Sequence, residues 1–169
     1  MNESTQPNFV FILTDDLGYA DPGCQNPNSK IPTPNLDRLA SEGVRFTDAH
    51  APHAVCTPTR YSVLTGRFCW RTHLKRGVLG ANAPPLIDDN RLTVGKMLQS
   101  QGYATACVGK WHLGASFHLK NETESVSVEN IDWDKPLTNG PIQQGFDYHY
   151  GIGKPGWTFL ENDRVVEAP

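Results

Sequence analysis

Long apolar runs are missing from this sequence of 169 residues. No stretch approaches the roughly 20 apolar residues that a membrane-spanning helix needs, so no membrane span is expected. The first eight residues, Met1 to Asn8, are polar and lack the basic start and apolar stretch of a signal peptide. The chain is therefore interpreted either as a cytoplasmic protein or as a mature form with a replacement methionine.

A surplus of positive charge is also missing, because the formal net charge is -3. This balance argues against nucleic acid held by a general basic field, so no nucleic-acid partner is expected. The basic residues are nevertheless clustered locally, which suits a small anionic ligand better than a polyanion: the cluster is Arg60, Arg67, Arg71, Lys75 and Arg76.

Cysteine is too sparse for a disulfide scaffold, and the four cysteines have no C-x-x-C spacing. Cys24 and Cys107 are interpreted as buried or lone thiols, and the role of Cys69 stays open. Cys56 differs from these three because of the residues that follow it.

Apolar runs and helix-starting residues alternate along the first two thirds of the chain. The segment Asn8–Leu13 is a continuous apolar run after its first residue, as in a strand that is buried on both faces. Thr33-Pro34 and Thr57-Pro58 are typical helix starts, and Gly43 and Gly66 are natural stops. The remaining predicted elements are strands at Val44–Ala49, Tyr103–Val108 and Gly145–Tyr150, a helix at Thr93–Gln101 with Val94, Met97 and Leu98 inward, a loop at Arg67–Asp89 and irregular chain at 115–144.

Strands that alternate with helices predict a layered α/β/α domain with a mostly parallel sheet. In such sheets, ligands bind beyond the carboxyl ends of the strands. Three polar clusters are predicted at this edge: Asp15-Asp16 after the first strand, Cys56 at a strand-to-helix junction, and Lys110 with His112 after the strand that ends at Val108.

Each cluster has a functional and a purely structural interpretation. Adjacent carboxylates such as Asp15 and Asp16 need a counter-charge, and calcium accepts such oxygen ligands. A solvated turn is the structural alternative. Lys110 can hold an oxyanion and His112 can exchange a proton, but a solvated lysine and a packed histidine fit the same residues.

Cys56-Thr57-Pro58-Thr59-Arg60 begins a predicted helix, whose free N–H groups favour an anion. Arg60 lies one turn after Cys56 and therefore on the same helix face. These residues indicate either a nucleophile beside an anion-binding helix end or a buried cysteine next to a structural arginine. Two interpretations also remain open for three aromatic residues, which suit either a sugar or aryl site or ordinary packing: Trp70, Tyr148 and Trp157.

Taken together, these segments resemble the sulfatase family of the alkaline-phosphatase-like superfamily. Residues 56–60 match its C-x-P-x-R signature, and residues 62–67 resemble the continuation that ends in T-G-R. Residues 11–18 are similar to the family's first strand with its metal-binding pair, residues 33–40 to the helix that follows, and Gly109-Lys110-Trp111-His112-Leu113-Gly114 to its G-K-W-H-L-G block.

The resemblance implies a sulfuric ester hydrolase whose nucleophile is made by a maturation enzyme that oxidises Cys56 to formylglycine. One hydroxyl of the hydrated aldehyde attacks sulfur and forms a covalent sulfoenzyme while the alcohol leaves, and the second hydroxyl then loses its proton as the aldehyde reforms and sulfate is expelled. Asp15, Asp16 and residue 56 then bind calcium, Arg60 and Lys110 hold the diol and the sulfate, and His112 hydrogen-bonds the diol. The implied substrate is a small-molecule or carbohydrate sulfate ester.

Several family features have no match after residue 114, namely a second metal-binding pair, a histidine that protonates the leaving group and a further sulfate-binding lysine. Residues 1–169 are therefore expected to be the N-terminal part of the catalytic domain of a longer, periplasmic or secreted precursor, with little turnover alone. The alternatives are a phosphonate or phosphate monoester hydrolase of the same superfamily and an inactive anion-binding fragment.

Overall fold

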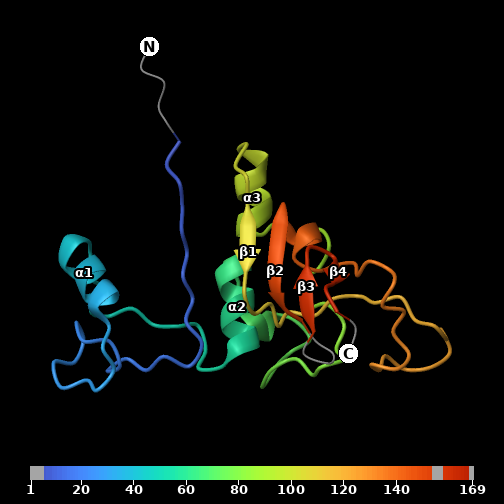
Figure 1. Cartoon of the computed structure of the whole chain (residues 1–169), viewed down its shortest axis with the longest axis horizontal. Helices are drawn as coiled ribbons and strands as arrows, with labels where there is room; N and C mark the ends of the chain where they lie inside the picture. The colour runs from blue at the N-terminus through green and yellow to red at the C-terminus, as the bar shows by residue number, and fades with distance from the viewer. Residues whose placement is uncertain (1–5, 154–157, 168–169) are drawn as a thin grey trace, which may run out of the picture. The chain divides into compact units, whose positions relative to one another are not determined.

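The computed structural model describes residues 6–153 and 158–167, and the chain divides into two compact units, residues 1–50 and 51–169. The first unit is built around helix α1, Pro34–Glu42 (Figure 1). Its first helical residue is proline, and it ends at Gly43, whose N–H donates to the Leu39 carbonyl oxygen. The predicted helix is therefore confirmed. Helix α1 also anchors the preceding loop, because Asp37 Oδ1 accepts from the Cys24 N–H at 2.7 Å.

The prediction of strands at 8–13 and 44–49 is wrong, because the chain is irregular in both segments. Their apolar side chains are open to solvent: Val10 is 87% exposed and Phe46 is 75% exposed. A strand needs a neighbour that pairs with its N–H and C=O groups, and the described part of the first unit contains no strand. Asp15 and Asp16 consequently follow an extended irregular segment.

The second unit contains a four-stranded sheet whose strands lie side by side in chain order (Figure 1). The strands are β1 (Ala106–Val108), β2 (Tyr148–Ile152), β3 (Phe159–Glu161) and β4 (Arg164–Val165). β1 pairs with β2 in parallel, with Cys107 opposite His149, and the other two pairings are antiparallel. The α/β class is confirmed, with a mixed sheet: short connections make β2, β3 and β4 run back and forth, whereas the longer crossover from β1 permits a parallel neighbour.

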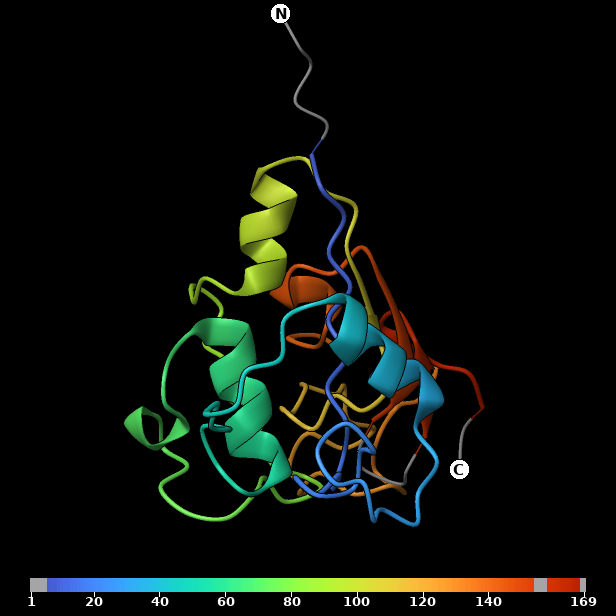
Figure 2. The same ribbon diagram turned by 90° about the vertical axis from the view of Figure 1, so that its left-hand side faces the viewer.

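The second unit also contains two helices, α2 (Cys56–Thr65) and α3 (Val94–Ser100). Figure 2 shows both on the same side of the sheet. Both were predicted, as was the strand ending at Val108. α2 ends at Gly66 with a left-handed φ of 64°. The loop at 67–89 is confirmed apart from one short 3-10 turn, η1 (Cys69–Arg71), and a second such turn, η2 (Ile142–Gln144), precedes β2.

The predicted inward face of α3 needs correction, because Met97 is 45% exposed and Gly95 is buried. A side-chain carbon at Gly95 would come within 2.5 Å of the Gly145 carbonyl oxygen. The helix therefore approaches the turn before β2 with its backbone, and only glycine leaves room at that contact. Thr93 fixes the approach, because its hydroxyl donates to the Gln144 carbonyl oxygen at 2.6 Å.

The core of the second unit joins α2 to two loops that flank the predicted site. Its fully or nearly buried apolar side chains come from α2, from residues 69–87 and from the segment after β1: they are Tyr61, Cys69, Leu79, Leu86, Ile87, Trp111 and Leu113. Because these side chains pack together, the position of each loop depends on the others.

The parallel pairing continues past β1 into Gly109. Its N–H donates to the Tyr150 carbonyl oxygen at 2.8 Å, and its carbonyl oxygen accepts from the Ile152 N–H at 3.3 Å. Directly beside it, a side-chain carbon at Gly151 would lie 1.8 Å from the Gly109 carbonyl oxygen. β2 therefore holds the beginning of the segment that carries Lys110 only as long as residue 151 has no side chain.

Gly151→Ala is expected to lower the free energy of unfolding by more than about 1 kcal/mol, because the added methyl group forces the two backbones apart. Gly80→Ala is the matched control, since Gly80 has open space around its Cα, and its effect should stay within about 0.5 kcal/mol. Thermal or urea unfolding measures both. Equal stability of the two variants would contradict the close contact between the backbones of residues 109 and 151.

Candidate active site

Lys110 and His112 follow β1 at its carboxyl end, as the sequence predicts. Between them, Trp111 is buried in the core and its indole N–H donates to the Gly114 carbonyl oxygen at 2.9 Å. His112 is only partly buried and has a positive φ of 54°, a conformation that is uncommon outside glycine. The buried tryptophan thus anchors a turn that presents the two polar side chains on either side of it.

Cys56 is the first residue of α2, is partly buried and forms no disulfide. Val55 before it has extended backbone angles, so the chain turns into the helix at the cysteine. The first N–H groups of a helix have no partner within the helix, and the residues of the first turn are therefore available to an anion. Arg60 follows one turn later, as predicted.

Hydrogen bonds join the first turns of α2 to the segment after β1. Arg60 Nη1 donates to the Lys110 carbonyl oxygen at 2.6 Å. The hydroxyl of Thr57 donates to the His112 carbonyl oxygen at 3.1 Å and accepts from the Leu79 N–H at 3.2 Å. Because Thr57 has no exposed surface, water does not compete for these bonds. The structure thus brings two of the predicted clusters together.

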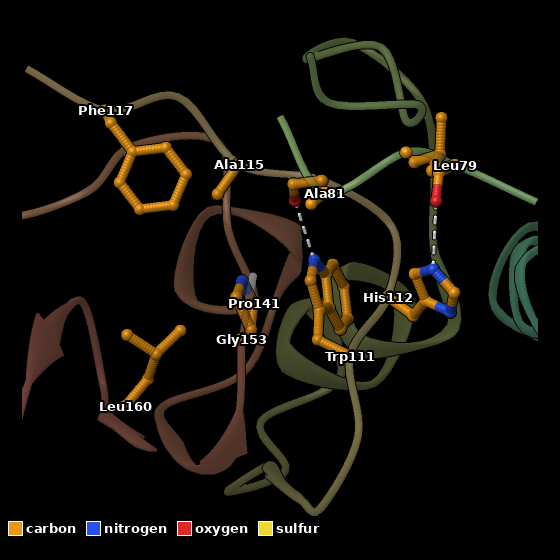
Figure 3. Close-up of a pocket in the computed structure, with 11 residues that line it drawn as sticks. Leu79, Ala81, Trp111, His112, Ala115, Phe117, Pro141, Gly153 and Leu160 are labelled. Atoms are coloured by element: carbon orange, nitrogen blue, oxygen red, sulfur yellow. Dashed lines mark hydrogen bonds between the residues drawn. The ribbon is translucent and has the colours of Figure 1, made fainter. Parts of the chain in front are cut away.

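The His112 ring is oriented by the same loop. Its Nε2 lies 3.1 Å from the Leu79 carbonyl oxygen (Figure 3). A carbonyl oxygen only accepts, so Nε2 carries the hydrogen of this bond, and the neutral ring then has Nδ1 as its basic nitrogen. Leu79 therefore contacts both Thr57 and His112 through its backbone, a role that no side-chain pattern in the sequence could reveal.

A small hollow lies beside His112 and Trp111, and apolar side chains such as Leu79, Phe117 and Leu160 line it (Figure 3). Its volume of about 20 Å³ holds roughly one water molecule. The hollow is therefore too small for a substrate as it stands.

Two other cysteines of the second unit are poor nucleophiles at neutral pH. Burial raises the pKa of Cys107 to about 11, although the positive charge of Arg60 opposes this shift. Burial also raises the pKa of the Cys69 thiol, against a hydrogen bond from Thr72. Because the thiolate is the reactive form of cysteine, both remain protonated and act as packing groups.

Asp15 and Asp16 belong to the first unit, where both are exposed and Asp16 has a positive φ of 59°. Their carboxylates are the hard oxygen ligands that calcium prefers, so the donor chemistry fits. Four carboxylate oxygens are nevertheless fewer than the six to eight ligands that calcium takes. Within residues 6–153 and 158–167, no group of three or more His, Cys, Asp or Glu residues could hold a metal ion.

Two of the three aromatic residues considered for a sugar or aryl site are exposed in the structure. Trp70 is 60% exposed on the loop after α2, and Tyr148 is 39% exposed on β2. Trp157 lies outside the described residues. Across the described ranges, no helix is long and apolar enough to cross a membrane.

A family model described as Sulfatase matches residues 7–158. The chain belongs to the sulfatase family. It is 38% identical over 167 residues to N-acetylgalactosamine-6-O-sulfatase of Bacteroides thetaiotaomicron, which covers 96% of this chain and 30% of that protein. It is also 38% identical over 154 residues to human steryl-sulfatase, covering 88% of this chain and 24% of that protein.

A solved structure supports the same assignment. It is described as concerning the metabolism of multiple glycosaminoglycans by Bacteroides thetaiotaomicron, and it superposes with a TM-score of 0.81 at 37% identity. The match covers 96% of this chain and 32% of that structure. This sulfatase chain therefore spans about a quarter to a third of the length of these relatives.

Thr57→Val is expected to destabilise the protein by about 1–3 kcal/mol, because it leaves the Leu79 N–H and the His112 carbonyl oxygen buried without their partner. Thr57→Ser keeps the hydroxyl and should cost less than half as much. Urea unfolding of the two variants compares them directly. Equal destabilisation by the two variants would show that the methyl group matters as much as the hydroxyl, and a Val variant as stable as the unmutated protein would contradict the role of the hydroxyl.

Proposed function

We propose that the protein to which this chain belongs hydrolyses sulfate monoesters, and that residues 1–169 form the N-terminal part of its catalytic domain. The observation that carries the proposal is the hydrogen-bonded junction between the C-x-P-x-R turn of α2 and the Lys110–His112 segment. Both segments belong to the motifs by which the chain resembles sulfatases, and the family match supports the same reaction.

Cys56 is the proposed source of the nucleophile, as formylglycine made by a maturation enzyme. Once hydrated, formylglycine would supply a hydroxyl that attacks sulfur while the S–O bond to the alcohol breaks and the alcohol leaves. Its second hydroxyl would then lose its proton, so that the aldehyde re-forms and sulfate is released. The chain contributes the surroundings of this group. At the N-terminal end of α2, helix N–H groups favour the negative charge that develops on the sulfate oxygens.

Arg60 and Lys110 are proposed to hold the sulfate, since each adds a positive charge where negative charge accumulates. The bond from Arg60 Nη1 to the Lys110 carbonyl oxygen fixes the guanidinium against the segment that carries the lysine. His112 is proposed to hydrogen-bond the hydroxyls of residue 56. The contact with the Leu79 carbonyl oxygen fixes its ring for this role, with Nδ1 as the acceptor.

Calcium is proposed to be held by Asp15 and Asp16 together with residue 56. Bound there, a divalent cation would lower the energy of a hydroxyl losing its proton and of the charged sulfate. Two carboxylates from this chain leave ligand positions for groups outside residues 6–153 and 158–167, which agrees with the share of the relatives that the chain spans.

The proposed substrate class is a carbohydrate or small-molecule sulfate ester. The relatives are named for sulfate esters of N-acetylgalactosamine and of sterols, so the family alone does not determine which alcohol carries the sulfate. Parallel assays with an aryl sulfate and an aryl phosphonate monoester test the reaction class. Preference for the phosphonate ester would overturn the proposal.

Cys56→Ala is expected to reduce aryl sulfate hydrolysis by the full-length protein to background while the melting temperature changes little. Cys24→Ala, which alters a cysteine of the first unit, is the control and should keep its turnover. Mass spectrometry of the peptide with residue 56 should show a loss of about 18 Da, from thiol to aldehyde. Turnover by the Cys56→Ala variant would remove this residue from the nucleophile role.

Asp15→Ala is expected to weaken calcium binding by the full-length protein at least tenfold, because a carboxylate ligand of a hard cation is lost. Isothermal titration with calcium measures the change. Asp21→Ala, in the loop that follows, serves as the control because Asp21 accepts from the Gly18 N–H instead. Unchanged calcium affinity in the Asp15 variant would exclude this residue from the metal site.

A further inference from the structure

Acidic residues are absent between Asp48 and Asp88, although the whole chain has 18 Asp and Glu residues and a formal net charge of -3. This segment of 39 residues contains five Lys and Arg residues, so its own formal charge is +5. None of the ion pairs among the described residues involves Arg71, Lys75 or Arg76. Arg71, Lys75 and Arg76 are therefore a local source of positive potential that no carboxylate of the described residues neutralises by direct pairing.

Two large aromatic side chains are exposed in the middle of this segment. Phe68 is 52% exposed and Trp70 is 60% exposed. Their rings are stacked, with centroids 5.9 Å apart and planes inclined by 18°. Cys69 between them is 4% exposed and belongs to the core. The loop thus buries Cys69 and leaves about half of the surface of each neighbouring aromatic side chain open to solvent.

The backbone of η1 holds these side chains in place. The Arg71 N–H donates to the Phe68 carbonyl oxygen at 3.1 Å, and Lys75 Nζ donates to the Trp70 carbonyl oxygen at 2.9 Å. Arg71 and Lys75 are both exposed. We name Phe68, Trp70, Arg71, Lys75 and Arg76 the aromatic–basic surface. Its positions are preformed, so a ligand would not have to order the loop.

The aromatic–basic surface leads along the chain to the candidate active site. Arg76 precedes Leu79 by three residues, and the Leu79 backbone contacts both Thr57 and His112. A ligand on this surface would therefore lie on the loop that orients the site's histidine. A single aryl sulfate has one charge and cannot occupy both places, whereas a chain molecule with repeated charges can.

We propose that the aromatic–basic surface binds a sulfated carbohydrate chain, an inference that rests on the proposed function and names a polymeric form of its substrate. Apolar sugar faces stack on Phe68 and Trp70, and sulfate groups pair with Arg71, Lys75 and Arg76. Aromatic rings interleaved with cations match a polymer whose charges alternate with ring faces. The net negative charge of the whole chain disfavours a nucleic acid, which is charged densely along its backbone.

The experiment measures binding of dextran sulfate to the full-length protein by isothermal titration, with neutral dextran as the comparison. Trp70→Ala should weaken dextran sulfate binding about tenfold or more, as truncation of a central aromatic contact does. Arg71→Ala and Lys75→Ala should each weaken it about fivefold, and rising salt should reduce the effect of both. Lys120→Ala, which removes an exposed cation elsewhere, should leave the affinity unchanged.

Three outcomes would overturn the inference: no binding of dextran sulfate, equal binding by the Trp70→Ala and Lys120→Ala variants, or tighter binding of single-stranded DNA than of dextran sulfate. Aryl sulfate turnover is measured in parallel, and it should be the same in the Lys120→Ala variant as in the unmutated protein. Absence of that turnover in the unmutated protein would count against the proposed function. The titration tests separately whether the aromatic–basic surface binds dextran sulfate.

Discussion

The hydroxyl of Thr57 is the contact on which the arrangement of the second unit depends. It lies in the first turn of α2, has no exposed surface and joins the backbone of Leu79 to that of His112. Helix, loop and strand end are far apart in the sequence, and a hydroxyl can donate to one and accept from another. The packing of Trp111 and Leu79 in the core supports the same junction from the apolar side. The Thr57 hydroxyl therefore fixes the position of α2 relative to the two backbones, which apolar packing alone would specify less closely.

The sequence predicts the helices of this chain well, because their ends are local features. Thr33-Pro34 and Gly66 determine where a helix begins or ends through backbone geometry that needs no distant partner. The strand at 8–13 was predicted from apolar content alone, and that content says which side chains avoid water but not which backbone they pair with. The mixed pairing of the sheet likewise depends on short connections between β2, β3 and β4, which an apolar pattern does not specify.

In the candidate site, too, the sequence predicts local features but not the distant groups that pair with them. Cys56, Arg60, Lys110 and His112 were identified from motifs and from their position after predicted elements. The structure joins the two segments that carry them through backbone oxygens, and a sequence pattern gives no sign of those acceptors. Thr57 lies inside the motif, yet its two partners come from elsewhere in the fold. Asp15 and Asp16 were predicted to follow a strand, and their role in binding calcium remains a proposal carried by ligand chemistry.

His149 lies at the centre of the sheet, with no exposed surface, and its Nδ1 is 2.9 Å from the Cys107 carbonyl oxygen on the neighbouring strand. Burial lowers its pKa below the usual value of 6.5, although the bond to that carbonyl opposes the shift. The unfolded chain therefore takes up this proton more readily than the folded one, and acidification below pH 6.5 favours unfolding until the lowered pKa is passed. The parallel pair β1–β2, which positions Lys110, therefore loses the stability that the neutral ring of His149 contributes as the pH falls below 6.5.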